Sequence, residues 1–174
     1  MTKALFASGS SLVSVNNLIE DLFLASGLDF RSLNIDTFSD KEEQSHKSQI
    51  LVLNKRNPEF SLQKALDAMI TGGVIVMNAD EKHFAGLKLT KPMRLITYGY
   101  NPKSTITASS IVVLDNISVQ CCIQRQFSIL NGDILEAQEF LVRTNYMELT
   151  EDDILSAVAV ALLCGVKPDM ISGK

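Results

Sequence analysis

The sequence predicts an α/β protein in which a parallel sheet flanked by helices is followed by an antiparallel β-meander. Three observations predict this class. Apolar strands alternate with amphipathic helices up to residue 100, strand-like segments separated by turn residues fill residues 106–142, and a capped helix follows Thr150. We expect one domain over residues 1–174, composed of an α/β part (1–100), a meander (101–148) and a closing helix (149–174).

The α/β part is predicted to begin with a strand, KALFA, and a helix that Gly27 is placed to cap. The helix has an apolar face whose members recur every three or four residues: Val15, Leu18, Ile19, Leu22 and Phe23. RSLNI predicts a second strand, and the polar stretch TFSDKEEQSHKS predicts a loop. QILVLN is a continuous apolar run, which is typical of a buried parallel strand.

A second helix is predicted between Ser61, as its N-cap, and the pair Gly72-Gly73, which would end it. Its apolar face is Leu62, Ala65, Leu66, Met69 and Ile70. VIVM and RLITY then predict two further strands. Alternation of strands and helices is typical of a parallel sheet with crossover connections.

The sequence pattern changes after Asn101-Pro102, where short segments rich in Ile, Val and Phe predict the meander. Asn131-Gly132 is its clearest hairpin turn. Thr150 and Asp153 predict a capping box at the start of the closing helix. We expect this helix to run to Gly165 and to stop before Pro168.

Composition excludes several classes of protein. The net charge of -4 and the lack of a Lys/Arg cluster argue against a nucleic-acid partner. No apolar run approaches the roughly 20 residues that cross a bilayer, and the first residues do not resemble a signal peptide, so we expect a cytoplasmic protein without a membrane partner. Cys121 and Cys122 are adjacent and predict reduced thiols on opposite faces of a strand.

Three segments carry a resemblance to a known family: VIVMNADEKHF, RLITYGYNPKSTITASSI and ILSAVAVALLCGVKPDMI. In this order they resemble segments of the central ATPase domain of the Mur ligases, a family that includes folylpolyglutamate and cyanophycin synthetases. The resemblance spans about residues 60–170. It implies a P-loop-like parallel sheet and a chemistry in which ATP phosphorylates a carboxylate and an amine then displaces the phosphate.

The phosphate-binding loop departs from the family pattern. Where the family carries Gly-Thr-x-Gly-Lys-Thr-Thr, this chain has ASGSSLVSV, with Leu12 at the Lys position and Val13 at the first Thr. The backbone amides of the turn could still hold a weakly bound anion at the helix N-terminus: Ser8, Gly9, Ser10 and Ser11. An exposed strand–helix turn explains the same residues, so we expect no cofactor.

Three polar residues match family positions near the nucleotide. Asn78 and Asp80 correspond to a turn that helps to shape the nucleotide region, although a capped strand end accounts for them equally well. Asp153 lies where many relatives carry an Asn that approaches adenine, and its capping role is the alternative explanation.

Lys64 lies within one residue of the family's carbamylated lysine, which makes it a candidate catalytic residue, with a solvated surface lysine as the alternative. Glu42 and His46 belong to EEQSH, which resembles the family's Glu-x-Ser-Ser-His segment and makes them candidate metal ligands. An exposed acidic loop is the alternative explanation of this segment.

The family's N-terminal nucleotide-sugar domain and C-terminal domain have no counterpart in these 174 residues. We therefore expect a degenerate, non-catalytic Mur-ligase-like domain, related to peptidoglycan biosynthesis, that acts as a binding or assembly module. The alternative is a subunit or fragment of an ATP-dependent carboxylate–amine ligase, which would need ATP and Mg²⁺. Surface that relatives cover with flanking domains should be apolar, which predicts a homo-oligomer or a protein partner. An unrelated α/β binding protein, lacking the meander, is a third possibility.

Overall fold

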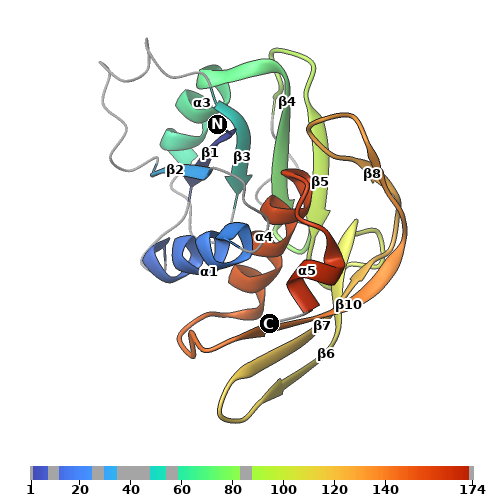
Figure 1. The fold of residues 1–174 in the computed structure, drawn as a ribbon. Coiled ribbons are helices and arrows are strands. Elements are labelled where there is room, and N and C mark those ends of the chain that lie inside the picture. The colour runs from blue at the N-terminus through green and yellow to red at the C-terminus, as the bar shows by residue number, and fades with distance from the viewer. Residues whose placement is uncertain are drawn as a thin grey trace.

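A computed structural model of the chain describes residues 2–7, 12–24, 30–34, 48–53, 59–82 and 88–172 (Figure 1). The elements in chain order are β1 (Thr2–Ala7), α1 (Leu12–Leu24), β2 (Phe30–Asn34), β3 (Ser48–Leu53), α3 (Glu59–Ala68), β4 (Met69–Asn78), β5 (Arg94–Tyr98), β6 (Ile106–Val113), β7 (Ile117–Ile123), β8 (Phe127–Ser128), β9 (Ile134–Leu135), β10 (Gln138–Thr144), α4 (Glu151–Leu163) and α5 (Pro168–Ser172).

One eight-stranded sheet, in the order β10-β7-β6-β5-β4-β3-β1-β2, organises the fold. Strands β2, β1, β3, β4 and β5 are parallel. Strand β6 meets β5 at a single pair, Tyr98 and Ile106, and then forms an antiparallel hairpin with β7, to which β10 adds. The predicted fold class is confirmed: the parallel sheet and the antiparallel strands are both present, and they are joined edge to edge.

Both faces of β3 are buried, which explains its continuous apolar run. Ile50 and Val52 of β3 belong to the core that contains α1 and α4. The alternate residues Leu51 and Leu53 pack on the other face with Leu66 of α3. The side-chain alternation of a strand therefore divides one apolar segment between two layers of helices.

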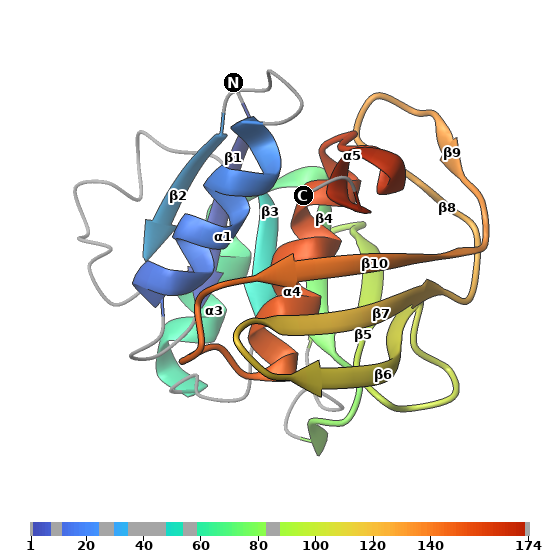
Figure 2. The same ribbon diagram turned by 60° about the horizontal axis from the view of Figure 1, so that its bottom comes forward.

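The closing helix α4 is the central element of the core. Every residue from Asp153 to Leu163 is buried. The helix packs beside α1 on one face of the parallel strands, and Figure 2 shows β10, β7 and β6 crossing on its other side. Small residues such as Ala157 and Ala161 suit this position, because a helix that is covered all round must let its neighbours approach closely.

Both ends of α4 are as predicted. The capping box is present: the Thr150 hydroxyl accepts from the Asp153 amide (3.3 Å), and the Asp153 carboxylate accepts from the Thr150 amide (3.0 Å). At the other end, Gly165 adopts φ 96° and its amide donates to Leu162 O. The Val166 amide donates to Ala161 O, which completes a Schellman motif.

The predicted bounds of the second helix were wrong at both ends. Helix α3 begins at Glu59, so Ser61 is inside it, and β4 already begins at Met69. Gly72 and Gly73 lie within β4, beside the register shift between β4 and β3, rather than ending the helix. The apolar pattern misled the prediction because Met69 and Ile70 continue the helical spacing, although their backbone is extended.

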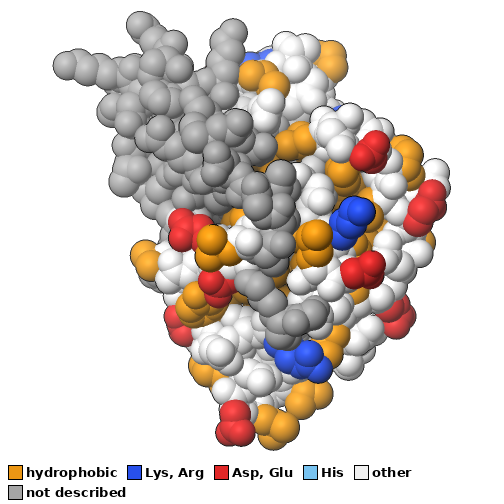
Figure 3. Space-filling model, in the orientation of Figure 1, with side chains coloured by type: hydrophobic (Ala, Val, Ile, Leu, Met, Phe, Trp, Pro, Cys, Tyr) orange, Lys and Arg blue, Asp and Glu red, His pale blue; other side chains and the backbone are white. Residues whose placement is uncertain are grey.

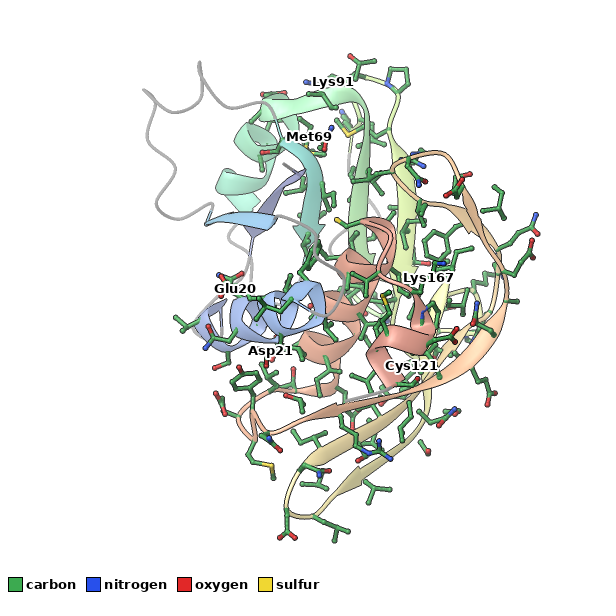
Figure 4. All side chains as sticks on the ribbon, in the orientation of Figure 1. Glu20, Asp21, Met69, Lys91, Cys121 and Lys167 are labelled. Carbon is green, nitrogen blue, oxygen red and sulfur yellow. The ribbon has the colours of Figure 1, made fainter. Side chains whose placement is uncertain are left out.

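Lys91 marks the true end of α3. Its ammonium donates to Asp67 O (2.9 Å) and to Met69 O (2.5 Å), and Figure 4 shows the two labelled residues Lys91 and Met69 side by side. Carbonyl groups at a helix C-terminus lack partners within the helix, so a lysine supplied from residue 91 satisfies them. Such a contact across more than twenty residues leaves no trace in the local sequence pattern.

Three smaller expectations have different outcomes. Pro168 opens the short helix α5, where proline suits the first position, rather than only stopping α4. Gly27 lies outside the described residues. Cys121 is buried and its neighbour Cys122 is half-buried, on alternate positions of β7, as expected.

Within the described ranges, no helix combines the length and apolar character needed to cross a bilayer.

Candidate functional site

The carboxyl ends of the parallel strands meet at one edge of the sheet. Ala7 at the end of β1 pairs with Leu53 of β3, which pairs with Met77 of β4. Asn78, the last residue of β4, pairs with Tyr98, the last residue of β5. Ligand sites of open α/β sheets lie in crevices outside this edge, so the residues that follow these strands are the first place to look.

A cleft of about 970 Å³ opens at this edge. Its walls come from the ends of β4 and β5, the β6–β7 hairpin and the first turn of α4. The lining residues are Asn78, Asp80, Glu81, Tyr100, Ile111, Val113, Ile117, Leu149, Thr150, Glu151, Asp152, Asp153 and Ile154. The cleft therefore has an apolar wall formed mainly by the hairpin and an acidic wall formed by the strand end and the helix.

The turn that follows β4 is held rigidly. The Asp80 amide donates to the Asn78 side-chain oxygen (2.9 Å), and the Asp80 carboxylate accepts from the Tyr100 amide (2.6 Å). Between them, Gly99 adopts φ 125°, and a Cβ placed there would lie 2.9 Å from the Asn78 oxygen. The two turns thus fit only because residue 99 has no side chain.

The first turn of α4 supplies the rest of the acidic wall. Glu151, Asp152 and Asp153 are consecutive, and the Tyr100 hydroxyl donates to the Glu151 carboxylate. Burial raises the pKa of Tyr98 well above its usual value, and the nearby Asp152, Asp153 and Glu81 raise it further. Burial and then the bond to Glu151 likewise raise the pKa of Tyr100. Both tyrosines are therefore held in their neutral, proton-donating form.

These raised pKa values predict a loss of stability at alkaline pH. The unfolded chain releases tyrosine protons near pH 10, whereas folded Tyr98 and Tyr100 retain theirs, so the contribution is complete below about pH 9 and falls as pH rises above about 10. Urea unfolding between pH 8 and 11 should show a falling midpoint. Tyr98→Phe should reduce the slope, and an unchanged midpoint across this range would contradict the prediction.

The lining of the cleft is rich in acidic residues. Five of its lining residues are carboxylic acids, and none of its described lining residues is Lys or Arg. The N-terminus of α4 contributes only about half a positive charge. Within the described residues, no group of three or more His, Cys, Asp or Glu side chains is arranged to hold a metal ion.

The candidates from the sequence are distributed unevenly. Asn78, Asp80 and Asp153 line the same cleft, so the turn after β4 and the first turn of α4, which are far apart in the chain, are brought together. Lys64 lies within α3, whose buried residues Ala65 and Leu66 face the opposite side of the sheet from α4, and its side chain is outside the described residues. The remaining candidates also lie outside the described residues: Ser8, Gly9, Ser10, Ser11, Glu42 and His46.

Sequence reasoning missed most of the acidic wall and all of the apolar wall. Glu151 and Asp152 are acidic residues in the first turn of a helix, where they stabilise its N-terminus, and this local role conceals their place in the cleft wall. Glu81 and Tyr100 follow strand ends, which was a usable signal. The hairpin residues Ile111, Val113 and Ile117 carry no local signal, because only the tertiary fold brings them to this edge of the sheet.

Comparison with known proteins shows the fold but not a family assignment. No family model matches the sequence, and no curated protein is similar to it. Among solved structures, the chain is similar to MurF from Acinetobacter baumannii, with a TM-score of 0.63 and 12% sequence identity. The match covers 99% of this chain and 44% of that one, so this chain spans less than half of the MurF chain. The chain therefore has a Mur ligase-like fold.

Proposed function

We propose that this Mur ligase-like chain does not bind ATP or catalyse ligation by itself and serves instead as a binding or assembly module. The proposal rests chiefly on the first turn of α1, and the charge of the cleft supports it. Under this proposal the chain is a single domain over residues 1–174 with a degenerate phosphate-binding loop and no cofactor. It would associate with itself or with a protein partner in the cytoplasm.

The first turn of α1 lacks the groups that hold a triphosphate. A phosphate-binding loop ends in a Lys that reaches the phosphates and a Ser or Thr that binds Mg²⁺. Here α1 begins with Leu12, followed by Val13, which is 71% exposed. The next hydroxyl, that of Ser14, donates to the Glu148 carboxylate, and this bond lowers the pKa of Glu148. A negative charge therefore lies beside the turn, where a nucleotide site requires a positive one.

The acidic cleft disfavours ATP further. At an effective dielectric constant of about 20, two like charges about 4 Å apart repel by about 4 kcal/mol. A triphosphate at this edge of the sheet would face five carboxylates without a described lysine or arginine in the cleft wall. A positively charged or amphipathic partner suits such a surface, which favours a binding module over a nucleotide site.

Isothermal titration with Mg-ATP tests the proposal. We expect no binding at micromolar nucleotide, because neither the loop nor the cleft supplies cationic groups. The double variant Leu12→Lys, Val13→Thr restores both missing groups and should strengthen binding at least tenfold. Leu24→Lys adds the same charge at the exposed last residue of α1 and should have no effect.

Micromolar binding of Mg-ATP by the unaltered chain that Leu12→Lys does not strengthen would overturn this proposal. That result would favour the alternative function, a subunit or fragment of an ATP-dependent carboxylate–amine ligase of the cell-wall peptide or polyglutamate type. In that alternative, Lys64, Asn78 and Asp80 would contribute to a site completed by another chain.

A further inference from the structure

Within the part of the chain that the structure describes, one edge of strand β6 is open along most of its length. Strand β7 pairs with one edge, whereas β5 reaches the other edge only at Ile106. Among the described residues, no strand pairs with this second edge from Thr107 to Val113. Exposed edges are usually protected by proline or charged side chains, and the β6 sequence ITASSIVV contains neither.

The open edge borders the cleft. Ile111 and Val113 of β6 line it on the side that faces the first turn of α4. The strand and its turn also expose large apolar side chains, with Val112 51%, Val113 58% and Leu114 77% exposed. Hydrophobic side chains are visible at the bottom of the molecule in Figure 3, where Figure 1 places the β6–β7 hairpin. Unpaired backbone groups and apolar side chains thus lie together beside five carboxylates.

We infer that this cleft binds an extended basic peptide segment of a partner protein, which adds as a strand to the open edge of β6 and directs Lys or Arg side chains toward the acidic wall. The inference rests on the proposed function, because it specifies the partner of the binding module. Backbone hydrogen bonds to β6 would supply affinity, and alternate side chains would meet the carboxylates. The edge from Thr107 to Val113 suits about seven residues at about 3.3 Å each.

Charge selects this occupant over a second copy of the chain. Pairing of two β6 edges would bring two acidic clefts together, each with five carboxylates, and the chain carries a net charge of -4. A segment with positive side chains relieves this repulsion, whereas a second copy doubles it.

Fluorescence anisotropy with a labelled, capped peptide Lys-Val-Lys-Val-Lys-Val-Lys tests the inference. We expect saturable binding that weakens at least tenfold in the double variant Asp80→Asn, Glu151→Gln. These changes remove charge and keep an oxygen that accepts from Tyr100. Glu136→Gln removes an exposed charge that does not line the cleft, and should change the Kd by less than twofold. Thermal unfolding of each variant shows whether it remains folded.

Two further probes separate strand addition from simple charge attraction. A peptide N-methylated at alternate residues cannot form the backbone bonds and should bind at least tenfold more weakly. Spermine carries positive charge without a peptide backbone and should not displace the peptide at equal concentration. Hydrogen exchange of those Thr107–Val113 amides that face away from β7 should slow when the peptide binds.

Equal binding of the N-methylated peptide, displacement by spermine, or indifference to the Asp80→Asn, Glu151→Gln change would each overturn the inference. Self-association through the β6 edge, detected by gel filtration and slowed exchange without peptide, would also overturn it. Absence of peptide binding together with absence of Mg-ATP binding overturns the inference and leaves the proposed function standing. Peptide binding by a chain that also binds Mg-ATP tightly would leave the peptide site standing and overturn the proposed function.

Discussion

Replacement of Gly99 by alanine is expected to destabilise the chain by about 3–5 kcal/mol, the larger part from steric overlap and the rest from the backbone conformation. Residue 99 has φ 125°, a backbone angle that L-amino acids with a side chain rarely adopt. An added Cβ would lie 2.9 Å from the Asn78 side-chain oxygen and closer still to the Asp80 carboxylate. The clash cannot relax easily, because Asp80 is held by the Tyr100 amide.

Gly132→Ala is the matched control for this change. Gly132 also has a positive φ, 96°, but a Cβ there would meet nothing within 4 Å. Only the cost of placing a residue with a Cβ at a positive φ, about 1–2 kcal/mol, should therefore reduce the stability of this variant. In a domain of this size about 1 kcal/mol corresponds to about 2–4 °C, so thermal unfolding should separate the two variants by several degrees. Equal melting temperatures for the two variants would show that the two turns do not pack as described.

The second large effect is expected for Tyr98→Ala. Tyr98 is 0% exposed and is among the largest fully buried side chains, and its ring lies in the core that contains α1 and α4. Loss of an aromatic ring from a packed core costs about 3–5 kcal/mol, because the cavity left behind closes only in part. Urea unfolding should show a lower midpoint with a similar slope.

Tyr98→Phe separates the ring from its hydroxyl. The hydroxyl donates to Leu53 O (3.3 Å) at the end of β3, and its loss should cost about 1 kcal/mol. If Tyr98→Ala were no more destabilising than Tyr98→Phe, the ring would not fill the core. The bond also joins two strand ends at the edge of the sheet where the cleft opens.

Local sequence patterns predicted most of the elements because each depends on nearby residues. The strand RLITY coincides with β5, and the capping box of α4 is made by Thr150 and Asp153 alone. The end of α3 was misplaced because Lys91 and the register of β3 decide it, and neither is close in sequence. Prediction therefore succeeded where a pattern is self-contained and was wrong where a distant residue supplies the hydrogen bond.

The cleft was predicted only in part for the same reason. Asn78, Asp80 and Asp153 were identified from a resemblance, and they do line one cleft. Its opposite wall depends on the place where β6 leaves the parallel sheet, a single pair between Tyr98 and Ile106. No periodicity in the sequence encodes that departure, so the open strand edge and its apolar side chains could not be foreseen.

The position of α4 along the chain constrains how the protein can acquire its structure during synthesis. All ten described strands precede this helix in sequence, yet it forms the centre of the core and covers apolar residues of α1, β4 and β5. Until residue 163 has emerged from the ribosome, those surfaces have no cover and can only collapse without specific packing. Folding must therefore await the arrival of this late segment, and its dependence on distant contacts makes it slow.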